Sequence, residues 1–562
     1  MGAGSWSYIT INFDSLVRRA GIYTSADIVI GIIGIILVFE ACRRIVGLPI
    51  LIISIVFIVY ALFGAYAPGF LNHRGYSVQR LVSHLFYNTE GIMGTPIGAS
   101  ATFIFLFIFF GALLDKTGIG QFFIDICNAI AGGFDGGPAK VAVLTSAMFG
   151  TVSGSSVSNT VGTGSFTIHM MKSLGYRPEF AGAVEASAST GGQLMPPIMG
   201  AASFLMAESL GIPYKDVAKA AIIPAILYFT GIFIMVHLEA KKTGLKGLSK
   251  ESLPKIGNLL MKKGYLIIPL ATIIYFFVLG KTAIYAGLMG IIAAGLVAVI
   301  NSIVDIIMKR NISFGLQDLI DVFVNAARNI ISVAVACAMA GVIIGVITLT
   351  GLGLKIGAGL ISISGGIPLL LLFLTMISSI ILGMGVPTTA NYLITSTIAA
   401  GAIIGLGYEP LAAHMFVFYF GIIADVTPPV ALAAMAGAAI AKSDPLKTGI
   451  EATKLSIGAF IIPYMFIFNP DILMINTTVS EVIPILITSL IGMFGVSAGL
   501  EGYVFRKCTV YERILFIIAG LLSIYPEFYT DIIGISIIVI LTVIQILTRN
   551  KNKTEMSVKN IT

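Results

Sequence analysis

Long apolar stretches recur along this chain, and they constrain its fold more than any other feature of the sequence. A helix must be apolar over about 20 residues to cross the roughly 30 Å of hydrocarbon in a bilayer, where only helices and closed barrels satisfy their backbone hydrogen bonds. Since 57% of the 562 residues are hydrophobic and 11% are charged, the sequence predicts an all-α integral membrane protein. Stretches that reach or approach the required length are residues 47–67, 265–280, 283–300, 330–349, 369–382 and 532–547.

Glycine and proline interrupt many of the other apolar stretches. The chain contains 62 glycines and 21 prolines, and they cluster inside apolar segments that are too short to span a bilayer. Such interruptions are expected where broken helices and re-entrant loops line a polar cavity.

The basic residues mark the cytoplasmic side rather than a nucleic-acid site. The net charge is +7, but the Lys and Arg residues do not gather on a face with aromatic residues. Seven lysines lie within residues 241–263 beside one acid, whereas no Lys or Arg occurs in residues 455–505, so we expect the first stretch in the cytoplasm. No two cysteines have the spacing of metal ligands, so we interpret all four as packing residues: Cys42, Cys127, Cys337 and Cys508.

A shift of 232 residues aligns the chain with itself. G-L-G-Y-E-P at residues 405–410 then falls on S-L-G-Y-R-P at 173–178, and T-P-P-V-A-L-A-A from Thr427 falls on M-P-P-I-M-G-A-A from Met195. Residues 159–220 and 391–452 share fifteen identities, where about five or six would arise by chance. The sequence therefore predicts a duplication.

The two copies are predicted to lie upside down relative to each other. The lysine-rich residues 241–263 end the first copy, while their counterparts, residues 473–495, include no basic residue. Two copies related by an axis in the membrane plane can open one central site to either side in turn, so the duplication favours a secondary transporter. A channel needs no such exchange, and a membrane enzyme would need a catalytic motif that the sequence does not offer.

Two polar segments hold matching positions in the copies. Residues 153–162 read S-G-S-S-V-S-N-T-V-G and residues 383–392 read G-M-G-V-P-T-T-A-N-Y, each between short apolar flanks that predict a re-entrant hairpin. Glycine and proline there leave backbone groups without internal partners. Carbonyl, hydroxyl and amide oxygens suit a small cation, and helix N-termini favour an anion. The alternative is that small residues only allow close helix packing.

The x-P-P segments predict two further broken helices, because proline removes a backbone donor and clashes with the preceding turn. They lie at residues 191–197 and 424–429, and Gln193 and Asp425 hold equivalent positions. Asp425 and Glu185 are acids inside apolar runs, so both are candidates for a proton-linked role. The alternative for both is a paired structural carboxylate, and His169 and His414 are weaker candidates.

Several strings resemble one known family. S-A-S-T-G-G-Q-L-M-P-P-I-M-G-A-A, G-M-G-V-P-T-T-A-N-Y and F-Y-F-G-I-I-A-D-V-T-P-P-V-A-L-A-A are similar to the large membrane subunit of tripartite ATP-independent periplasmic (TRAP) transporters. The resemblance is specifically to the fused type that works with TAXI binding proteins. It extends through P-G-F-L-N-H-R-G-Y-S at residues 68–77 and the apolar stretches after residue 480, so it covers nearly the whole chain.

The resemblance implies a non-enzymatic, elevator-type secondary transporter of the cell (cytoplasmic) membrane. A mobile domain with both hairpins and both broken helices would slide against a scaffold, driven by Na⁺, while an extracytoplasmic TAXI-type protein delivers a small organic anion. Carried over by motif, the first cation site comprises Ser153, Ser156, Asn159, Gly192 and Pro196. The second comprises Gly383, Gly385, Thr388, Asn391, Thr427 and Pro428. The solute is expected to contact Ser155, Ser156, Asn159, Thr388, Thr389 and Asn391.

The same resemblance divides the chain into five regions. Residues 1–92 resemble part of the small-subunit and scaffold region, 93–240 and 328–470 are the two inverted repeats, 241–327 form the lysine-rich loop and linking helices, and 471–562 form extra C-terminal helices with a basic tail. Fused members begin with the small subunit's helices, whereas this sequence starts at M-G-A-G-S-W-S-Y-I-T. Three alternatives follow for the upstream helices: they are absent, lost to a mis-set start, or separately encoded. In the last case a separate small membrane subunit is a partner, together with membrane lipid.

Two alternatives to this function stay open. Glu185, Asp425 and the histidines leave a route for H⁺ as the coupling ion. A self-sufficient anion/sodium symporter would need no binding protein. Because no Arg lies at either tip, a carboxylate solute would be held by hydroxyls, amides and helix ends.

Overall fold

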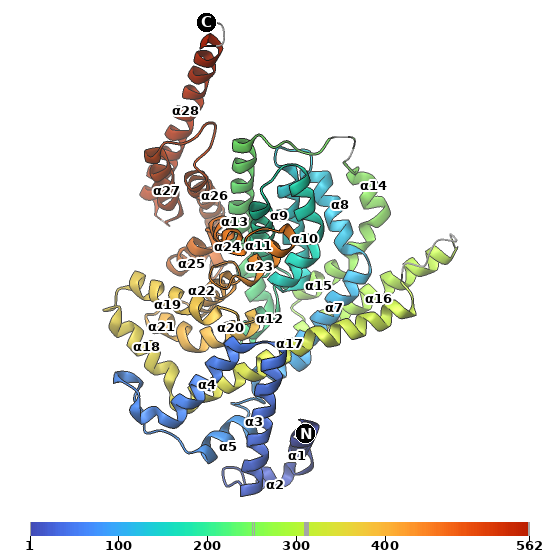
Figure 1. Cartoon of the computed structure of the whole chain (residues 1–562), viewed down its shortest axis with the longest axis vertical. Helices are drawn as coiled ribbons and strands as arrows, with labels where there is room; N and C mark the ends of the chain where they lie inside the picture. The colour runs from blue at the N-terminus through green and yellow to red at the C-terminus, as the bar shows by residue number, and fades with distance from the viewer. Residues whose placement is uncertain (1, 250, 252, 308–313, 526, 560–562) are drawn as a thin grey trace. The chain divides into compact units, whose positions relative to one another are not determined.

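The protein is built from α-helices, as the sequence predicts (Figure 1). The computed structural model describes residues 2–249, 251, 253–307, 314–525 and 527–559, and the only β-pairing among them is an isolated bridge between Tyr503 and Lys507. Ten helical segments in this part of the chain are long and apolar enough to cross a membrane. The prediction of an all-α integral membrane protein is therefore confirmed. Lys250 of the lysine-rich loop and residues 560–562 of the basic tail lie outside the described residues.

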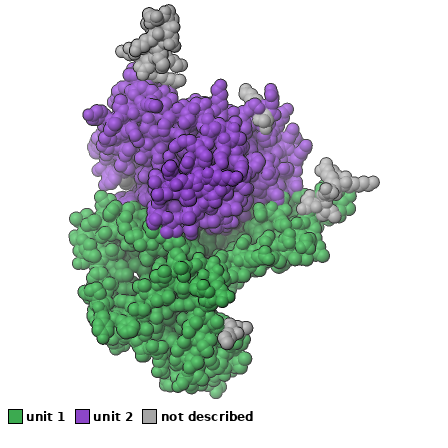
Figure 2. Space-filling view, in the orientation of Figure 1, with its two compact units in different colours: residues 1–117, 200–215, 267–424 green, residues 118–199, 216–266, 425–562 purple. Residues whose placement is uncertain are grey.

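The chain forms two compact units, which Figure 2 distinguishes by colour. Unit 1 contains residues 1–117, 200–215 and 267–424, and unit 2 contains residues 118–199, 216–266 and 425–562. Each unit draws on both copies of the repeat. The region boundaries predicted at residues 92, 240, 327 and 470 follow the repeat instead, and they stay predictions.

Unit 1 begins with the N-terminal helices and is centred on α17, a 35-residue helix that packs against α3, α4, α5 and α7. Its helices are α1 Gly2–Ile11, α2 Phe13–Arg18, α3 Ser25–Ile45, α4 Leu48–Phe63, α5 Val78–Tyr87, α6 Thr95–Ala99, α7 Phe105–Lys116, α12 Ala201–Leu210, α15 Ile268–Val278, α16 Ala283–Ile307, α17 Leu316–Thr350, α18 Leu352–Ile363, α19 Pro368–Gly383, α20 Thr388–Thr395, α21 Gly401–Gly405 and α22 Pro410–Ile423. One π-helical turn, Ser100–Ile104, joins α6 to α7, and another, Ser396–Ala400, joins α20 to α21.

Unit 2 packs α9, α10, α23 and α24 around α11, and its C-terminal helices α26, α27 and α28 pack on one another. Its helices are α8 Ile119–Ala131, α9 Gly137–Ser153, α10 Ser156–Ser173, α11 Pro178–Gly192, nearly all of α13 Tyr214–Thr243, α14 Ile256–Lys263, α23 Leu432–Ala441, α24 Pro445–Leu455, α25 Gly458–Phe468, α26 Val479–Glu501, α27 Val510–Ile524 and α28 Phe528–Lys559.

The duplicated sequence folds into duplicated elements. Adding 232 to the bounds of α10, Ser156 and Ser173, gives Thr388 and Gly405, which are the start of α20 and the end of α21. The same shift carries α9 onto α19, α11 onto α22 and α12 onto α23, with bounds that agree within two residues. Both copies therefore contain a helical hairpin followed by a helix that breaks.

The local signals for these elements also recur. α11 and α22 each start with proline, Pro178 and Pro410, whose fixed φ suits the first helical turn. The turn before each helix contains a glycine with positive φ, Gly175 at +97° and Gly407 at +89°, a conformation that L side chains rarely adopt. The same sequence chemistry thus sets the same chain path twice.

Candidate functional site

The first polar segment forms the tip of a helical hairpin in unit 2, as predicted. We call α9, Gly154, Ser155 and α10 hairpin 1; its two helices pack against each other. α9 ends at Ser153 and is followed by Gly154, which has φ +61°. Ser155 caps α10, because its Oγ accepts a hydrogen bond from Ser158 N at 3.3 Å. The hairpin tip therefore presents the N-terminus of an 18-residue helix.

Hairpin 1 meets both broken helices at Asp425. Ser156 Oγ donates to Asp425 Oδ2 at 2.6 Å, and Gln193 Nε2 donates to the same oxygen at 3.4 Å. All three side chains are buried, and no ion pair reaches Asp425 within the described parts of the chain. Gln193 and Asp425 are repeat equivalents, so the two copies contact each other here through equivalent positions. A buried acid whose only bonded partners are neutral donors is a site that a cation would stabilise.

Glycines bring the end of α11 directly onto hairpin 1. A Cβ on Gly150 would lie 2.2 Å from Gly192 Cα, and a Cβ on Gly192 would lie 3.0 Å from Asn159 Nδ2. Asn159 is fully buried; its Nδ2 donates to Ser146 O at 3.0 Å and its Oδ1 accepts from Thr163 Oγ1 at 3.3 Å. The nearby Ser153 Oγ is buried without a hydrogen-bond partner among the described residues. Such an orphaned oxygen fits a ligand of a small cation.

The second polar segment forms the matching hairpin in unit 1. We call α19, residues 384–387 and α20 hairpin 2; Gly385 in its tip has φ +72°. Asn391 is buried, and its Nδ2 donates to Gly421 O at 2.7 Å, while its Oδ1 has no partner in the described structure. Cβ atoms on Gly383 and Gly421 would lie 2.4 and 2.9 Å from Asn391 Nδ2, so the two glycines make room for the amide. Thr389 is buried beside Asn391 and Thr388 begins α20.

Both x-P-P segments interrupt their helices as predicted. α11 ends at Gly192 and α12 starts at Ala201, whereas α22 ends at Ile423 and α23 starts at Leu432. The peptide bonds Pro196–Pro197 and Pro428–Pro429 are cis. Met199 and Ala431, which are repeat equivalents, have φ +65° and +44°, and non-glycine residues in this region are uncommon outside functional segments. Thr427 and Pro428 therefore lie in irregular backbone, as a carbonyl ligand set requires.

Glu185 lies in a cage of hydroxyl groups. It is fully buried on α11; its Oε1 accepts from Ser146 Oγ at 2.5 Å, from Ser189 Oγ at 3.2 Å and from Thr163, and its Oε2 accepts from Thr167. No ion pair involves Glu185 in the described part of the molecule. Its repeat equivalent is Val417, so the buried carboxyl group belongs to the first copy alone.

Glu185 was predicted as a candidate residue, whereas the hydroxyl residues around it were not: Ser146, Thr163, Thr167 and Ser189. Asn159, Thr163 and Thr167 follow one another at intervals of four on α10, and Glu185 and Ser189 have the same spacing on α11. Residues four apart share one face of a helix, so this spacing was the available signal. On hairpin 2 the analysis likewise missed Thr375 and Ser379, whose hydroxyl oxygens are buried without a partner among the described residues.

The two histidines differ in their surroundings. His169 is exposed, and its Nδ1 lies 2.8 Å from Ser165 O on the preceding turn of α10. His414 Nδ1 lies 2.7 Å from Tyr392 OH, next to Asn391 in sequence. Neither ring contacts a carboxylate among the described residues. The described chain also contains no group of three or more His, Cys, Asp or Glu residues that could hold a metal.

The P-G-F-L-N-H-R-G-Y-S segment is a folded connection between α4 and α5. His73 Nε2 lies 3.0 Å from Tyr60 O, and Tyr76 OH donates to Leu349 O of α17 at 2.6 Å. Lys355 Nζ of α18 donates to Asn72 O at 2.8 Å. These bonds fasten the connection to the helices of unit 1.

One protein family and several known proteins are similar to this chain. The family model described as "Tripartite ATP-independent periplasmic transporter, DctM component" matches residues 33–481. The 2,3-diketo-L-gulonate TRAP transporter large permease protein of Escherichia coli is 23% identical over 380 residues, which are 66% of this chain and 84% of the relative. The isethionate TRAP transporter permease protein DctMQ of Oleidesulfovibrio alaskensis is 26% identical over 340 residues, 60% of this chain and 51% of the relative.

Other relatives match a shorter part of the chain. The C4-dicarboxylate TRAP transporter large permease protein of Pseudomonas aeruginosa is 29% identical over 150 residues, which are 26% of this chain and 34% of the relative. The chain thus spans about a third of the length of that relative. The family match, by contrast, includes both hairpins and both broken helices.

Proposed function

The chain belongs to the DctM component family of TRAP transporters, and from this premise we propose that it imports a small organic anion through two hairpins and two broken helices. It is a multi-pass inner-membrane protein of a transporter family rather than an enzyme. The observation that carries the proposal is the repetition of a hairpin and a helix break 232 residues apart, each beside buried, partly unpartnered oxygen atoms. Repeated elements of this kind suit alternating access.

The solute is proposed to be a carboxylate or a similar anion. The relatives are named for 2,3-diketo-L-gulonate, isethionate and C4-dicarboxylates, all of which are organic anions. Neither tip contains Lys or Arg, so the N-terminus of α10 and that of α20 each offer an anion backbone N–H groups and neutral side chains. The side chains proposed to contact it are Ser155, Ser156, Asn159, Thr388, Thr389 and Asn391.

We propose sodium as the coupling ion. Oxygen atoms of hydroxyl, amide and carbonyl groups suit a hard monovalent cation. Ser153 Oγ and Asn391 Oδ1 are buried oxygens without a hydrogen-bond partner among the described residues. An elevator movement of the hairpins and broken helices would carry ion and solute together. The second candidate is H⁺, which is favoured by Glu185 and Asp425, two buried carboxyl groups that contact only neutral donors.

An extracytoplasmic binding protein of the TAXI type is proposed to deliver the solute. This partner follows from the resemblance of the x-P-P and hairpin strings, and a separate small membrane subunit is proposed beside it. A self-sufficient symporter would transport without either. A secreted TAXI-type protein encoded by a neighbouring gene would favour the three-part transporter.

Uptake into proteoliposomes tests the function. Radiolabelled succinate, a C4-dicarboxylate, is the first solute, and the candidate binding protein supplies a wider solute screen. Sodium and proton gradients are imposed separately, with and without the binding protein. We expect uptake only with the binding protein and an inward sodium gradient. Uptake that persists without sodium but follows a proton gradient would replace sodium by H⁺, and uptake without the binding protein would favour the symporter.

A further inference from the structure

The three C-terminal helices lie beyond the part of the chain that the family model matches. That match ends at residue 481, whereas α26, α27 and α28 extend from Val479 to Lys559. Glycines join α26 to α27 closely, since a Cβ on Gly520 would lie 2.6 Å from Gly492 O and one on Gly495 would lie 3.0 Å from Gly520 Cα. The three helices thus form a packed addition to the family fold.

This addition is packed onto α13 within unit 2. Leu238 of α13 shares a buried apolar cluster with residues of all three helices and with Val504, which lies between α26 and α27; the helical members are Ala498, Phe516, Ala519, Ile538 and Leu541. Ser497 Oγ also donates to Gly231 O at 3.5 Å, and a Cβ on Gly231 would lie 2.6 Å from Met493 Cε. The contact surface is therefore continuous along α26.

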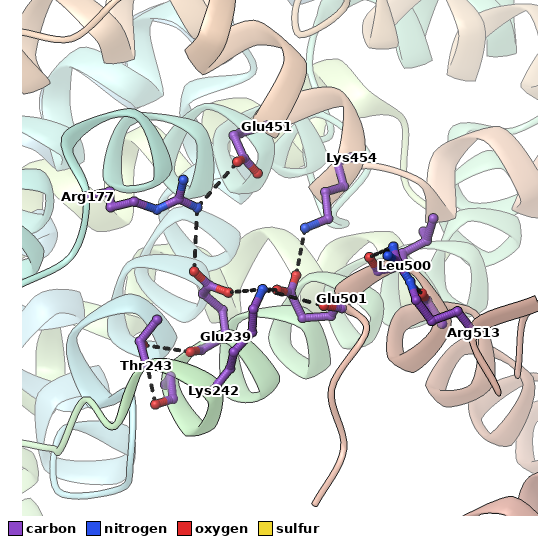
Figure 3. A network of polar contacts seen from close by, with 11 residues as sticks. Arg177, Glu239, Lys242, Thr243, Glu451, Lys454, Leu500, Glu501 and Arg513 are labelled. Carbon is purple, nitrogen blue, oxygen red and sulfur yellow. Dashed lines mark hydrogen bonds and ion pairs between the residues drawn. The ribbon is translucent and has the colours of Figure 1, made fainter. Parts of the chain in front are cut away.

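At the end of α26, Glu501 joins both copies of the repeat (Figure 3). Its side chain is fully buried; Oε1 lies 2.6 Å from Lys242 Nζ of α13, and Oε2 lies 2.8 Å from Lys454 Nζ of α24. The pairs continue to Glu239 and through Arg177 to Glu451, so three acids and three bases form one network. Without Glu501, two partly buried ammonium groups would face each other.

α24 in turn supports the second broken helix. Thr453, which precedes Lys454, donates from Oγ1 to Val426 O at 3.0 Å. A Cβ on Gly449 of the same helix would lie 3.0 Å from Pro428 Cγ, so the helix backbone rests against the proline. Pro428 is one of the residues proposed for the second cation site, and Val426 directly precedes Thr427, another of them.

α24 also supports α11, which ends at the first break. Ser187 Oγ of α11 donates to Ala452 O at 3.0 Å, and Tyr228 OH of α13 donates to Ser187 O at 2.8 Å and lies 3.1 Å from Ser456 Oγ. A displacement of α24 would therefore reach both breaks through direct bonds.

We propose that Glu501 is a positioning residue for the ion site: by fixing Lys454 and Lys242 it holds α24, and α24 holds Val426 and Pro428. The inference rests on the proposed function only where it names the ion. Glu501 thus joins a segment beyond the family-model match to the part of unit 2 that is proposed to bind the coupling cation.

Glu501→Gln tests the inference against Glu512→Gln as a matched control. Glu512 is a buried acid of the same addition, but it bonds only to Arg506, Thr509 and Gln545 among the described residues. Both variants are expected to melt at a lower temperature than the wild type. Only a positioning role predicts an effect of Glu501→Gln on the distant break.

Two measurements on the purified protein distinguish the roles. Hydrogen exchange of residues 425–431 is expected to rise in Glu501→Gln and to stay unchanged in Glu512→Gln. The NaCl concentration for half-maximal thermal stabilisation, against choline chloride at equal ionic strength, should rise about fivefold in Glu501→Gln alone, the lower end of typical coupling between sites. Glu501→Asp should restore part of both, and Lys454→Gln is a milder second variant because Lys454 is 33% exposed.

Unchanged exchange at residues 425–431 in both Glu501→Gln and Lys454→Gln would overturn the inference, as would equal changes in Glu512→Gln. If the wild-type protein shows no response to NaCl, sodium coupling fails instead. The exchange measurement then still decides whether Glu501 positions the break.

Discussion

Hairpins 1 and 2 have the same chain path but different polar partners. Each contains a buried asparagine at the same repeat position, yet Asn159 bonds to Ser146 and Thr163, whereas Asn391 bonds to Gly421 and leaves its Oδ1 without a partner among the described residues. Glu185 has no acidic equivalent in the second copy. The difference shows that the two copies share backbone geometry rather than polar contacts, so the two proposed cation sites need not be alike.

The largest loss of stability is predicted at the contact between Gly150 and Gly192, which only the first copy has. Gly150→Ala places a Cβ 2.2 Å from Gly192 Cα, a backbone atom that cannot rotate away. The repeat equivalents, Leu382 and Ala424, carry side chains. We expect a loss of roughly 3 kcal/mol, the upper end for overpacking, measured as a lower melting temperature with aggregation on size exclusion.

Two alanine substitutions serve as controls for this contact. Gly401 has no atom within 4 Å of a Cβ, so Gly401→Ala should change stability by less than about 1 kcal/mol. Gly383→Ala meets Asn391 Nδ2 at 2.4 Å, but a side chain can move, so it should keep the fold and lose the sodium response. If Gly150→Ala melts at the wild-type temperature, the contact between Gly150 and Gly192 is no more closely packed than its equivalent in the second copy.

The buried charge of the first copy is predicted to have the next largest effect. Glu185→Leu removes the acceptor of four hydroxyl groups, three of them on hairpin 1, and should cost about 2 kcal/mol because those buried donors lose their shared partner. Glu185→Gln keeps one acceptor oxygen and should cost less. Thermal melting measures both.

The same pair of variants separates a structural from a proton-linked Glu185. Uptake that survives in Glu185→Gln at near wild-type rate, with its responses to both the sodium and the proton gradient unchanged, would assign the carboxyl group to the fold. Uptake that persists under a sodium gradient but ceases to respond to an imposed proton gradient would assign it to H⁺ coupling. Either result would show what Glu185 adds to the first copy that Val417 does not add to the second.

Much of this fold could be predicted from the sequence, because glycine and proline act locally. The hairpin tips and helix breaks lie where S-G-S-S, G-V-P-T and x-P-P occur, since these residues set φ or remove a donor whatever the surroundings. The hydroxyl cage around Glu185 could not be predicted in the same way, because it joins α9, α10 and α11, and their relative register comes from packing. Glu501 was invisible for a related reason: its partners are 47 and 259 residues away in the chain.

Because Gln193 and Asp425 are repeat equivalents in contact, their side chains can be exchanged between the two copies. Asp425→Asn should cost about 1 kcal/mol, because Ser156 and Gln193 lose a charged acceptor. The double variant Gln193→Asp/Asp425→Gln restores one acid and one amide at the contact. We expect partial recovery of the melting temperature, since Ser156 bonds to position 425 alone. Full recovery would mean that the Ser156 bond contributes nothing to stability.

The smallest predicted difference in stability is the one between the two asparagines. Asn159→Ala removes a donor to Ser146 O and an acceptor for Thr163, and should cost about 1 kcal/mol or more. Asn391→Ala removes only the donor to Gly421 O and also releases an unsatisfied buried oxygen, so its cost should be about half as large. Thermal melting without sodium measures this order.

The order should reverse when sodium is added. Asn391 Oδ1 is free to ligate an ion without breaking a bond, whereas Asn159 Oδ1 lies 3.3 Å from Thr163 Oγ1, whose single proton it shares with Glu185. Asn391→Ala should therefore remove more of the sodium-induced rise in melting temperature than Asn159→Ala. Equal losses in the two variants would mean that both amides ligate equally and that their different partners in the ion-free structure have no consequence for binding.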